Sequence, residues 1–565
     1  MANLSQQKRQ RMLEFLQTLR EEHKDEDTTL AAIGEIETEL NAKKYGLVWE
    51  EHVEKVDIQM QDNIPVFSEV AEREINKSES CDYNFLLEGD NLHSLYLLEK
   101  THKGKIDVIY IDPPYNTGNS FTYNDEIIDD LDSFKHSKWI SFMTSRLNIA
   151  KQLLKPEGFL WISIDETELF NVKLLIDEIF GPNNFRSLIT VISNPGGRDY
   201  GGIAKTTEYV LVYSRSENGV LQKVESNERT FTMFDEIGGF ELRELRNRNI
   251  KFNDQNRPNL CYPFYVDPDT KDENGLYSIA LEKSNKFRVE VMPLVSQGVQ
   301  TVWRWGKEQR SRKNLNTNIK AKLKRDGTFM IVEKYRDDRV MLKNSLTDKC
   351  YRTENGSVQI KDIFGYKKFD YPKPTEIPSI ALQTYPNKNA TVLDFFAGSG
   401  TTGQAVLELN KQDGGNRKFI LCTNNENNIC ENITYQRLKT VITGLRQDGS
   451  EYSKGISSNL KYYKTGFVAK DEEFLSDALL DHIKEMVQLE HGVRVDGTKH
   501  IIVMSEEEVD ELEANWNDYK NVEALYVSRN VLLSTQQNAK FKNVDIYVIP
   551  DYYFNFELKE VGLSW

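Results

Sequence analysis

The run Asp112-Pro113-Pro114-Tyr115 combines residue types that can activate a poorly nucleophilic amino group. Two consecutive prolines fix φ and end a strand, so the Asp112 carboxylate and the Pro113 carbonyl are held as a rigid pair of hydrogen-bond acceptors. Both can bind one exocyclic amino group, whose lone pair is otherwise delocalised into a ring or a carbonyl. Two acceptors on its hydrogens favour a pyramidal nitrogen, and they stabilise the transition state of attack on an electrophile more than the ground state.

Tyr115 adds an aromatic face to this run. A base taken out of its stack can lie on such a face, and stacking on an aromatic side chain contributes about 1 to 3 kcal/mol per base. A four-residue run of this kind, taken alone, also fits a turn that ends a strand and places a structural tyrosine. The functional interpretation therefore needs a second motif.

Residues 391–402 predict a strand, a turn with two glycines and the start of a helix. The glycines permit close approach of a ligand to the backbone, three hydroxyl side chains lie beside them, and the helix N-terminus favours a carboxylate. An adenosine-bearing cofactor with an amino-acid tail fits such a loop, as does a purely structural turn. No run of the form G-x-x-x-x-G-K-[ST] occurs, so nothing indicates ATP hydrolysis. The residues expected in the cofactor loop are Asp394, Phe396, Ala397, Gly398, Ser399, Gly400, Thr401 and Thr402.

Short apolar runs that alternate with helical patterns must position these two motifs. Strand, helix, strand order with continuous apolar strands predicts an α/β fold with a parallel sheet covered on both faces. Ligands bind such sheets at the carboxyl ends of the strands, where both motifs fall. The pattern predicts strands at 84–90, 106–112, 158–164, 188–193, 208–213 and 391–396, and helices at 92–100, 137–154, 167–180 and 403–409.

The α/β rhythm disappears after residue 215, and residues 216–365 are irregular and polar. We therefore expect one α/β domain that is interrupted by an insert. Residues 1–60 show helical periodicity, which predicts a pair of helices packed on the body or on a second subunit. The expected division is a helical segment at 1–80, the first half of the α/β domain at 81–215, the insert at 216–365, the second half at 366–450 and a C-terminal domain at 451–565.

The net charge of −16 is unevenly spread. Residues 216–365 carry 27 basic and 22 acidic residues, while 301–325 hold nine basic residues against one acid, Glu308. Trp303 and Trp305 lie within this run, which suits a surface that contacts phosphates and bases. An ordinary solvated basic face explains the run as well. The nine basic residues are Arg304, Lys307, Arg310, Arg312, Lys313, Lys320, Lys322, Lys324 and Arg325.

Composition excludes several classes of protein. Charged residues make up 28% of the chain and no run of 18 apolar residues occurs, so we expect no membrane span. The first residues lack the apolar core and cleavage site of a secretory signal, which favours the cytoplasm. Five cysteines without a C-x-x-C pair indicate neither a disulfide framework nor a zinc site.

Taken together, the two motifs resemble those of the amino-group methyltransferases that use S-adenosylmethionine. Their order, D-P-P-Y, then the insert, then F-x-G-x-G, matches the circularly permuted β class of DNA methyltransferases. The wider run 112–125, with Glu88–Leu92 and Tyr371–Pro374, is similar to the modification subunits of type III restriction systems. The resemblance covers about residues 83–445.

The resemblance implies a Rossmann-like, circularly permuted methyltransferase sheet with an inserted target-recognition domain and extra N- and C-terminal segments. Residues 81–215 would be its catalytic half, with Asp112, Pro113, Pro114 and Tyr115 at the site, and 366–450 its half for S-adenosylmethionine. Phe396, Gly398 and Gly400 would shape the methionine side of the cofactor pocket, and Asp90 would accept from its adenine. Glu426 is the expected ribose ligand, but two amides precede it where the family has an acid, which leaves that ligand open.

An aspartate rather than a serine before Pro-Pro-Tyr favours adenine N6 over cytosine N4. Cytosine C5 chemistry needs a cysteine nucleophile, and no Pro-Cys pair lies at a strand end. The implied partners are duplex DNA, a second copy in a homodimer and a helicase-nuclease restriction subunit. The alternatives are a solitary adenine or N4-cytosine methyltransferase, and a DNA-binding subunit that directs such a partner. Residues 451–565, with 12 basic and 21 acidic residues, would serve dimerisation, partner docking or structure alone.

Overall fold

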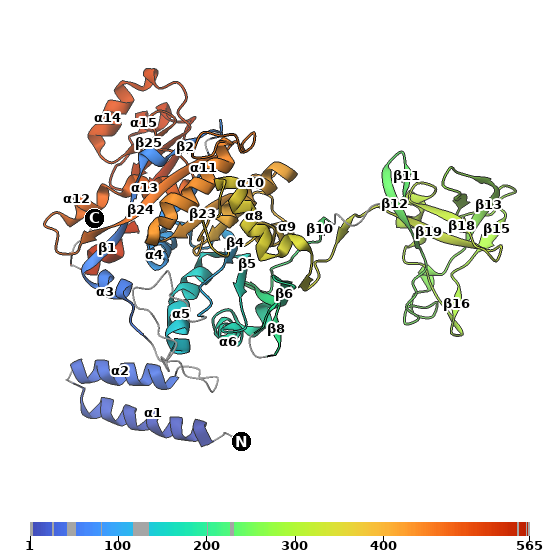
Figure 1. Cartoon of the computed structure of the whole chain (residues 1–565), viewed down its shortest axis with the longest axis horizontal. Helices are drawn as coiled ribbons and strands as arrows, with labels where there is room; N and C mark the ends of the chain where they lie inside the picture. The colour runs from blue at the N-terminus through green and yellow to red at the C-terminus, as the bar shows by residue number, and fades with distance from the viewer. Residues whose placement is uncertain are drawn as a thin grey trace. The chain divides into compact units, whose positions relative to one another are not determined.

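The computed structural model describes residues 4–24, 27–41, 52–80, 82–116, 135–199, 202–225, 231–550, 553–560 and 562. Residues 117–125, which contribute to the resemblance above, lie outside this described part. The chain divides into two compact units (Figure 1). The first comprises Met1–Val220, Asn344–Leu382 and Asn387–Trp565, and the second comprises Leu221–Lys343 and Gln383–Pro386.

A large mixed sheet forms the centre of the first unit (Figure 1). Its order is β1-β24-β3-β23-β22-β4-β5-β9-β6-β21, with β2 paired to β24. The strands from β24 to β5 run parallel, while β9 is antiparallel to both of its neighbours. The bounds are β1 (Asn63–Glu69), β2 (Ile75–Asn76), β3 (Asn84–Glu88), β4 (Ile106–Ile111), β5 (Leu154–Ile164), β6 (Phe185–Ile192), β9 (Thr207–Ser214), β21 (Ser345–Leu346), β22 (Thr391–Asp394), β23 (Lys418–Thr423) and β24 (Asn459–Ala469).

The seam between β22 and β4 is the topological switch point of this sheet. The two strands pair in parallel register, with Val392 opposite Val108. From this seam the chain continues in opposite directions, because β23 lies beside β22 on one side and β5 lies beside β4 on the other. In open α/β sheets, ligands bind at such a point, beside the carboxyl ends of the two strands. β3 and β4 are buried along their whole length, as expected for central parallel strands.

Two groups of helices pack beside the sheet, α13-α4-α5-α6 and α10-α11-α8 (Figure 1). The predicted α/β fold is confirmed, and the helices expected at 92–100, 137–154 and 167–180 are present with slightly different ends. The bounds are α3 (Lys55–Asp62), α4 (Asn91–His102), α5 (Lys135–Leu153), α6 (Leu169–Phe180), α8 (Thr353–Phe364), α9 (Glu376–Thr384), α10 (Thr401–Asp413), α11 (Tyr435–Thr443), α12 (Leu475–Leu480), α13 (Ile483–His491) and α16 (Asn555–Glu560).

Two stretches pack differently from the sequence-based division. Residues 344–365, expected in the insert, belong to the first unit, because β21 pairs with β6 and α8 packs on α11. The segment 451–565, expected as a separate domain, contributes β24 to the central sheet. β24 joins because Tyr462 and Tyr463 are fully buried there. The remaining domain boundaries stay predictions.

The rest of 451–565 forms a small parallel sheet with its own core. β25 (His500–Val503), β26 (Ala524–Ser528) and β27 (Asp545–Ile549) lie in that order, connected by α14 (Glu506–Ala514) and α15 (Thr535–Lys540). Buried side chains such as Leu512, Leu525 and Phe541 pack between these elements. The residues that follow β24 in the chain thus form a separate α/β layer.

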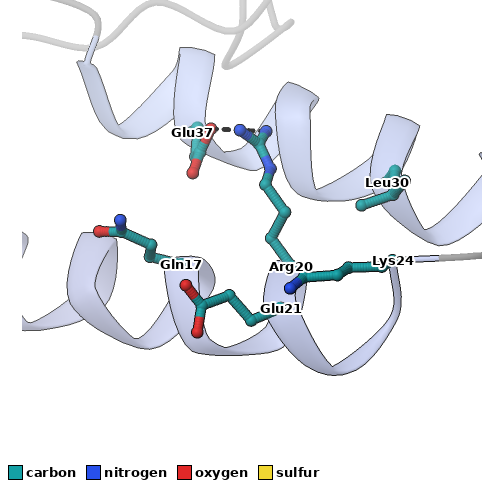
Figure 2. A pocket seen from close by; sticks show the side chains of 6 residues that line it. All are labelled: Gln17, Arg20, Glu21, Lys24, Leu30 and Glu37. Carbon is teal, nitrogen blue, oxygen red and sulfur yellow. Dashed lines mark hydrogen bonds and ion pairs between the residues drawn. The ribbon is translucent and has the colours of Figure 1, made fainter.

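Near the N-terminus, α1 (Leu4–Glu22) and α2 (Asp27–Asn41) form the predicted helical pair. Leu16 and Ile33 are buried, and Arg20 pairs with Glu37 at 2.9 Å. Figure 2 shows the pocket between the two helices, whose lining is mostly charged and polar: Gln17, Arg20, Glu21, Lys24, Leu30 and Glu37. It shares no residue with the two motifs. Among the described residues, no helix is long and apolar enough to cross a membrane.

The second unit is built on an antiparallel sheet of order β11-β12-β19-β18-β14-β13-β15. The expectation that Trp303 and Trp305 lie on a contact surface is wrong, since they are only 2% and 5% exposed. The Trp303 ring packs edge-on to Phe264, with 5.5 Å between centroids, and its Nε1 donates to the carbonyl of Tyr262 at 2.7 Å. These large side chains form the core that a small sheet needs.

The remaining short elements complete the fold. In the second unit the strands are β10 (Val224–Glu225), β11 (Met233–Asp235), β12 (Gly238–Glu244), β13 (Phe264–Lys271), β14 (Tyr277–Ala280), β15 (Val289–Val291), β16 (Val295–Ser296), β17 (Val299–Gln300), β18 (Ile319–Leu323), β19 (Phe329–Tyr335) and β20 (Arg339–Val340), with one short helix, α7 (Arg312–Asn314). The hairpin of β7 (Arg198–Asp199) and β8 (Ala204–Lys205) belongs to the first unit.

The burial of Trp303 predicts a stability effect. Trp303→Ala should lower the free energy of unfolding of the second unit by about 3 to 5 kcal/mol, since it removes a buried ring and leaves a cavity. Hydrogen exchange of the second-unit amides in the full chain measures this. Phe234→Ala, at a side chain that is 64% exposed, is the control and should change stability by less than about 0.5 kcal/mol. Unchanged exchange in Trp303→Ala would contradict a core role.

Candidate active site

The run Asp112-Pro113-Pro114-Tyr115 directly follows β4, at the carboxyl edge of the sheet. Pro113 is buried, and the carbonyl of Pro114 accepts a hydrogen bond of 2.7 Å from Nε1 of Trp139 on α5. Trp139 is itself buried, so its indole cannot move without disturbing the core. The backbone that presents the Asp112 carboxylate and the Pro113 carbonyl is therefore fixed on both sides.

A buried carboxylate holds the turn that follows Tyr115. Asn116 adopts a left-handed conformation with φ of 56°, and its amide donates to Glu168. His136 Nδ1 lies 2.7 Å from Glu168 Oε1, and Asn171 donates to Oε2 at 2.7 Å. Glu168 is fully buried. Its role could not be predicted from the sequence, because a lone glutamate before a helix has no motif that marks it as buried.

The polar surroundings of Asp112 come from three separate segments. The hydroxyl of Tyr115 donates to Asp112 Oδ1 at 2.7 Å. Lys373 Nζ donates to the hydroxyl of Tyr115 at 2.5 Å, pairs with Glu208 of β9, and lies 3.6 Å from Asp112 Oδ1. Sequence reasoning missed Glu208 entirely. Lys373 had one signal, its place in the run Tyr371–Pro374 ahead of the glycine loop.

These neighbours act on the pKa of Asp112 in opposite directions. Desolvation raises the pKa of the Asp112 carboxyl, and the Lys373 ammonium and the Tyr115 hydroxyl oppose this by stabilising the carboxylate. Burial and the two nearby carboxylates, Asp112 and Glu208, hold the pKa of Tyr115 well above its usual value. Tyr115 is therefore a hydrogen-bond donor and an aromatic surface here, and not a phenolate base.

The glycine turn between β22 and α10 is held tightly against the adjoining helical segment 430–434. Gly398 and Gly400 have φ of 48° and 80°, a region that favours glycine. Thr434 Oγ1 donates to the carbonyl of Gly398 at 2.5 Å, and a Cβ on Gly400 would lie 3.1 Å from Thr434 Cγ2. A side chain at position 400 would thus strain the backbone and crowd this contact. The turn offers a ligand its backbone and no bulky side chain.

Asp394 supports this turn from inside. Its Oδ1 accepts from the amide of Phe396 at 3.0 Å and its Oδ2 from the hydroxyl of Thr402 at 2.5 Å. Burial raises the pKa of Asp394 to about 7, with these two hydrogen bonds opposing the shift. Both oxygens are engaged, so its demonstrated role is to shape the loop. A direct contact between Asp394 and a cofactor stays a prediction.

The hydroxyls of the loop face the protein. Arg437 NH1 donates to Ser399 Oγ at 2.9 Å and to Thr401 Oγ1 at 2.8 Å, and Thr402 donates to Asp394. All three hydroxyl residues are buried. Consequently the backbone of the loop, and not these side chains, is the part that can face a ligand.

One segment connects the two motifs. Thr401 Oγ1 donates to the backbone carbonyl of Lys373 at 3.3 Å. The side chain of Lys373 in turn contacts Tyr115 and Glu208. The start of α10 and the run that follows β4 are thereby joined through a single residue. The structure thus brings Asp112 and the glycine loop, more than 280 residues apart in sequence, to one edge of the sheet.

Asp90 and Glu426 lie at the carboxyl ends of β3 and β23, beside the glycine loop in strand order. Asp90 caps α4 by accepting from the amide of Leu92 at 2.7 Å, and its side chain is 26% exposed. Arg146, fully buried, holds this corner through Glu54 at 2.7 Å and lies 3.5 Å from Asp90. Acids at the ends of two strands next to a glycine turn suit the polar groups of an adenosine. These contacts, and those of the buried Phe396 and Ala397, stay predictions.

The basic run 301–325 falls into two groups in the second unit. Four of its members form ion pairs at 2.5 to 3.1 Å: Arg304 with Glu333, Arg312 with Glu308, Lys320 with Asp272 and Lys324 with Asp326. Five have no ion pair with an acid among the described residues: Lys307, Arg310, Lys313, Lys322 and Arg325. Lys322 and Arg325 are exposed near the turn between β18 and β19. The uncompensated charge is therefore smaller than the sequence count.

The chain is similar in sequence to known DNA methyltransferases. The family model N6_N4_Mtase, described as DNA methylase, matches residues 106–436. The chain is 32% identical over 383 residues to the type II methyltransferase M.KpnI of Klebsiella pneumoniae, covering 66% of this chain and 89% of that protein. It is 31% identical over 446 residues to the Mod subunit of the type III restriction-modification enzyme EcoPI of Escherichia phage P1, covering 71% of this chain and 67% of that protein.

Among solved structures, the chain is similar to PvuII DNA methyltransferase, which is named as cytosine-N4-specific. The sequence identity is 12%, the TM-score is 0.32, and the match covers 65% of this chain and 94% of that one.

The raised pKa of Asp394 predicts a pH-dependent stability. The pKa of Asp394 is near 3.8 in the unfolded chain and about 7 in the folded chain. At a pH between these two values, Asp394 is therefore protonated to a greater extent in the folded chain than in the unfolded chain. This group therefore costs stability as the pH rises through that window. Asp394→Asn removes this cost because the amide does not ionise. Its Oδ1 can still accept from the Phe396 amide, and its Nδ2 can donate to the Thr402 hydroxyl once that hydroxyl rotates to accept.

Relative to the unchanged chain, Asp394→Asn should gain stability from pH 4 to pH 8, by up to about 4 kcal/mol. Urea midpoints at several pH values measure the difference. A difference that does not vary with pH would show that Asp394 is ionised throughout.

Proposed function

The chain belongs to the N6/N4 DNA methylase family, and from that premise we propose that it methylates adenine N6 of a base flipped out of duplex DNA. The observation that supports this most directly is the junction at the switch point of the sheet. There the run that begins at Asp112 and the glycine loop share one edge, and Lys373 connects them. An amino-group acceptor pair and a cofactor turn at one edge of the sheet are the two parts that such a transfer needs.

In this reaction the Asp112 carboxylate and the Pro113 carbonyl accept the two hydrogens of the exocyclic amino group. S-adenosylmethionine would supply the electrophilic methyl group: the C–S bond would break as the N–C bond forms, S-adenosylhomocysteine would leave as a neutral thioether, and the methylated nitrogen would lose one hydrogen as a proton. Acceptance by two fixed oxygens favours a lone pair directed at the methyl group, and the fixed backbone means that no reorganisation is needed at the moment of transfer. Tyr115 binds the flipped base by stacking and keeps its hydroxyl on Asp112.

The cofactor residues take distinct roles in this proposal. The backbone at Gly398 and Gly400, with Phe396 and Ala397, lines the methionine side. Asp90 binds the adenine and Glu426 the ribose. Asp394, Ser399, Thr401 and Thr402 hold the loop in shape through their buried hydrogen bonds.

Duplex DNA is contacted by the second unit in this proposal. Its five basic residues without an ion pair, Lys307, Arg310, Lys313, Lys322 and Arg325, bind phosphates and position the unit on the duplex. The buried Trp303 and Trp305 support the sheet beneath them and do not stack on bases.

We further propose that the chain is the modification and recognition subunit of a type III system, that it forms a homodimer, and that it works in the cytoplasm. Similarity to the Mod subunit of EcoPI supports this, and a helicase-nuclease restriction subunit would then be its partner. The alternative is a solitary methyltransferase. It is favoured by the match to M.KpnI, a type II methyltransferase, over most of that protein. ATP-dependent DNA cleavage after addition of a co-encoded restriction subunit separates the two.

Methyl transfer itself is the first test. The chain should transfer label from S-adenosylmethionine to duplex DNA, and nucleoside analysis should find N6-methyladenine. Asp112→Ala should lower the single-turnover rate by about 100-fold or more, since it removes one fixed acceptor of the transition state, while cofactor and DNA binding persist. Asp370→Ala, at an exposed carboxylate, is the control and should leave the rate unchanged.

Three outcomes would contradict this proposal. N4-methylcytosine would refute the assignment to adenine. Label found only in protein or RNA would refute DNA as the substrate. An unchanged rate in Asp112→Ala would remove Asp112 from the mechanism.

The second unit predicts a salt-dependent binding defect. Lys322→Glu with Arg325→Glu should weaken binding to duplex DNA and lower the slope of log affinity against log salt by about 0.9 for each phosphate that is no longer neutralised. Lys271→Glu with Lys283→Glu, two exposed lysines of the second unit outside the run, is the charge-matched control. Fluorescence anisotropy at several salt concentrations measures both quantities. Equal slopes in the variant and the unchanged chain would make the run a solvated face only.

A further inference from the structure

Lys373 is the one cation that the structure places beside Asp112 among the described residues. Its ammonium lies 3.6 Å from Asp112 Oδ1, 2.5 Å from the Tyr115 hydroxyl and 4.8 Å from the centroid of the Tyr115 ring. Its side chain is only 11% exposed. A lysine seldom stays buried unless it is paired, so this position must be held by specific partners.

Glu208 anchors the ammonium. It lies on β9, the antiparallel strand beyond β5, and it is the partner to which Lys373 comes nearest. Because Glu208 binds the ammonium directly, the distance to Asp112 is longer than a normal hydrogen bond. Lys373 thus acts on Asp112 through space. Within the described residues, the only hydrogen bond shorter than 3.5 Å to the Asp112 carboxylate comes from Tyr115, on Oδ1.

The charges around Asp112 come from several separate parts of the chain. The titratable and charged groups that face it are Tyr110 on β4, Tyr115 in the following turn, Glu208 on β9, Lys373 ahead of α9 and Asp394 at the end of β22. All of the ionisable acids among them disfavour a charged Asp112 when ionised. Lys373 is the group that opposes them.

We propose that Lys373 is a positioning residue of the methyl-transfer site. Anchored by Glu208, it keeps Asp112 ionised while leaving the carboxylate available to accept from the target amino group. The proposal rests on the function proposed above and extends it. Neither residue touches the reacting atoms in this scheme. Lys373 acts through Asp112, and Glu208 acts by anchoring Lys373 and by the direct effect of its own charge on Asp112.

The ionisation state matters because a carboxylate only accepts, whereas a protonated carboxyl presents one O–H donor. A donor directed at the amino group would compete with the required geometry. Burial lowers the pKa of Lys373, but Asp112 and Glu208 outweigh it and raise the pKa above the usual value. The lysine therefore remains charged when Asp112 needs it. Without it, two neighbouring carboxylates would share poorly solvated surroundings.

The test compares pH profiles of kcat/KM for methyl transfer by the full chain. Lys373→Met should move the acid limb to higher pH by about one to three units, since a neighbouring cation shifts a carboxyl by that amount. Its rate should recover to within about tenfold of the unchanged chain above that limb. Lys373→Arg, which keeps the charge, should leave the limb in place. Glu208→Gln should move it to lower pH, because one repelling carboxylate is lost.

The control is Lys367→Met, at an exposed lysine shortly before Lys373 in the chain. It should leave the pH profile of kcat/KM unchanged. A loss in Lys373→Met that is the same at every pH would overturn the proposal and indicate a structural role. A raised KM for S-adenosylmethionine without movement of the limb would overturn it in favour of direct cofactor binding.

A second measurement needs no DNA. The ¹³C carboxyl resonance of Asp112, identified by its absence in Asp112→Asn, should titrate at higher pH in Lys373→Met than in the unchanged chain. Equal titrations would overturn the proposal even if methylation proceeds. If the titrations differ and no DNA is methylated at any pH, the proposed function fails while the charge relationship stands.

Discussion

The pairing of β22 with β4 is the constraint on which the rest of this structure depends. It makes neighbours of two strands that the chain reaches far apart, and the chain leaves this seam in opposite directions. Open α/β sheets bind their ligands at the carboxyl ends of two such strands. Asp112 and the glycine loop lie at this edge because each directly follows one of the two strands. Every chemical property proposed for the site depends on this shared edge.

Buried charges hold this edge of the sheet in shape. Arg146 ties α5 to the start of α4, Arg437 ties α11 to the glycine loop, and Glu168 holds the turn after Tyr115. A buried charge without its partner costs several kcal/mol, so each of these groups fixes the position of the backbone that it binds. Lys373 differs from them in one respect, since it is held beside Asp112, whose charge state the proposed reaction uses. Rigidity and electrostatics thus come from the same kind of contact.

Much of the fold could be predicted from local patterns. Continuous apolar strands predicted a parallel sheet, and Pro113 and Gly400 predicted where strands must end, because proline and glycine act on their own backbone. The sequence patterns gave wrong predictions where burial in the tertiary structure determines the position of a residue or strand. Trp303 sits in a basic run and yet packs in the core of the second unit. β24 joins the central sheet although the chain before it suggested a separate domain, because Tyr462 and Tyr463 find their burial there.

The sequence alone predicted the proposed methyl transfer. It has an acceptor pair after one predicted strand and a glycine turn after another, and the resemblance to the methyltransferases linked the two motifs. Tertiary structure alone decided which charges surround Asp112. Glu208 lies on a strand with no motif, and Lys373 lies 165 positions beyond it. Electrostatic effects depend on distance and burial, which local sequence does not encode, so the chemistry of a residue type is readable from sequence and its protonation is not.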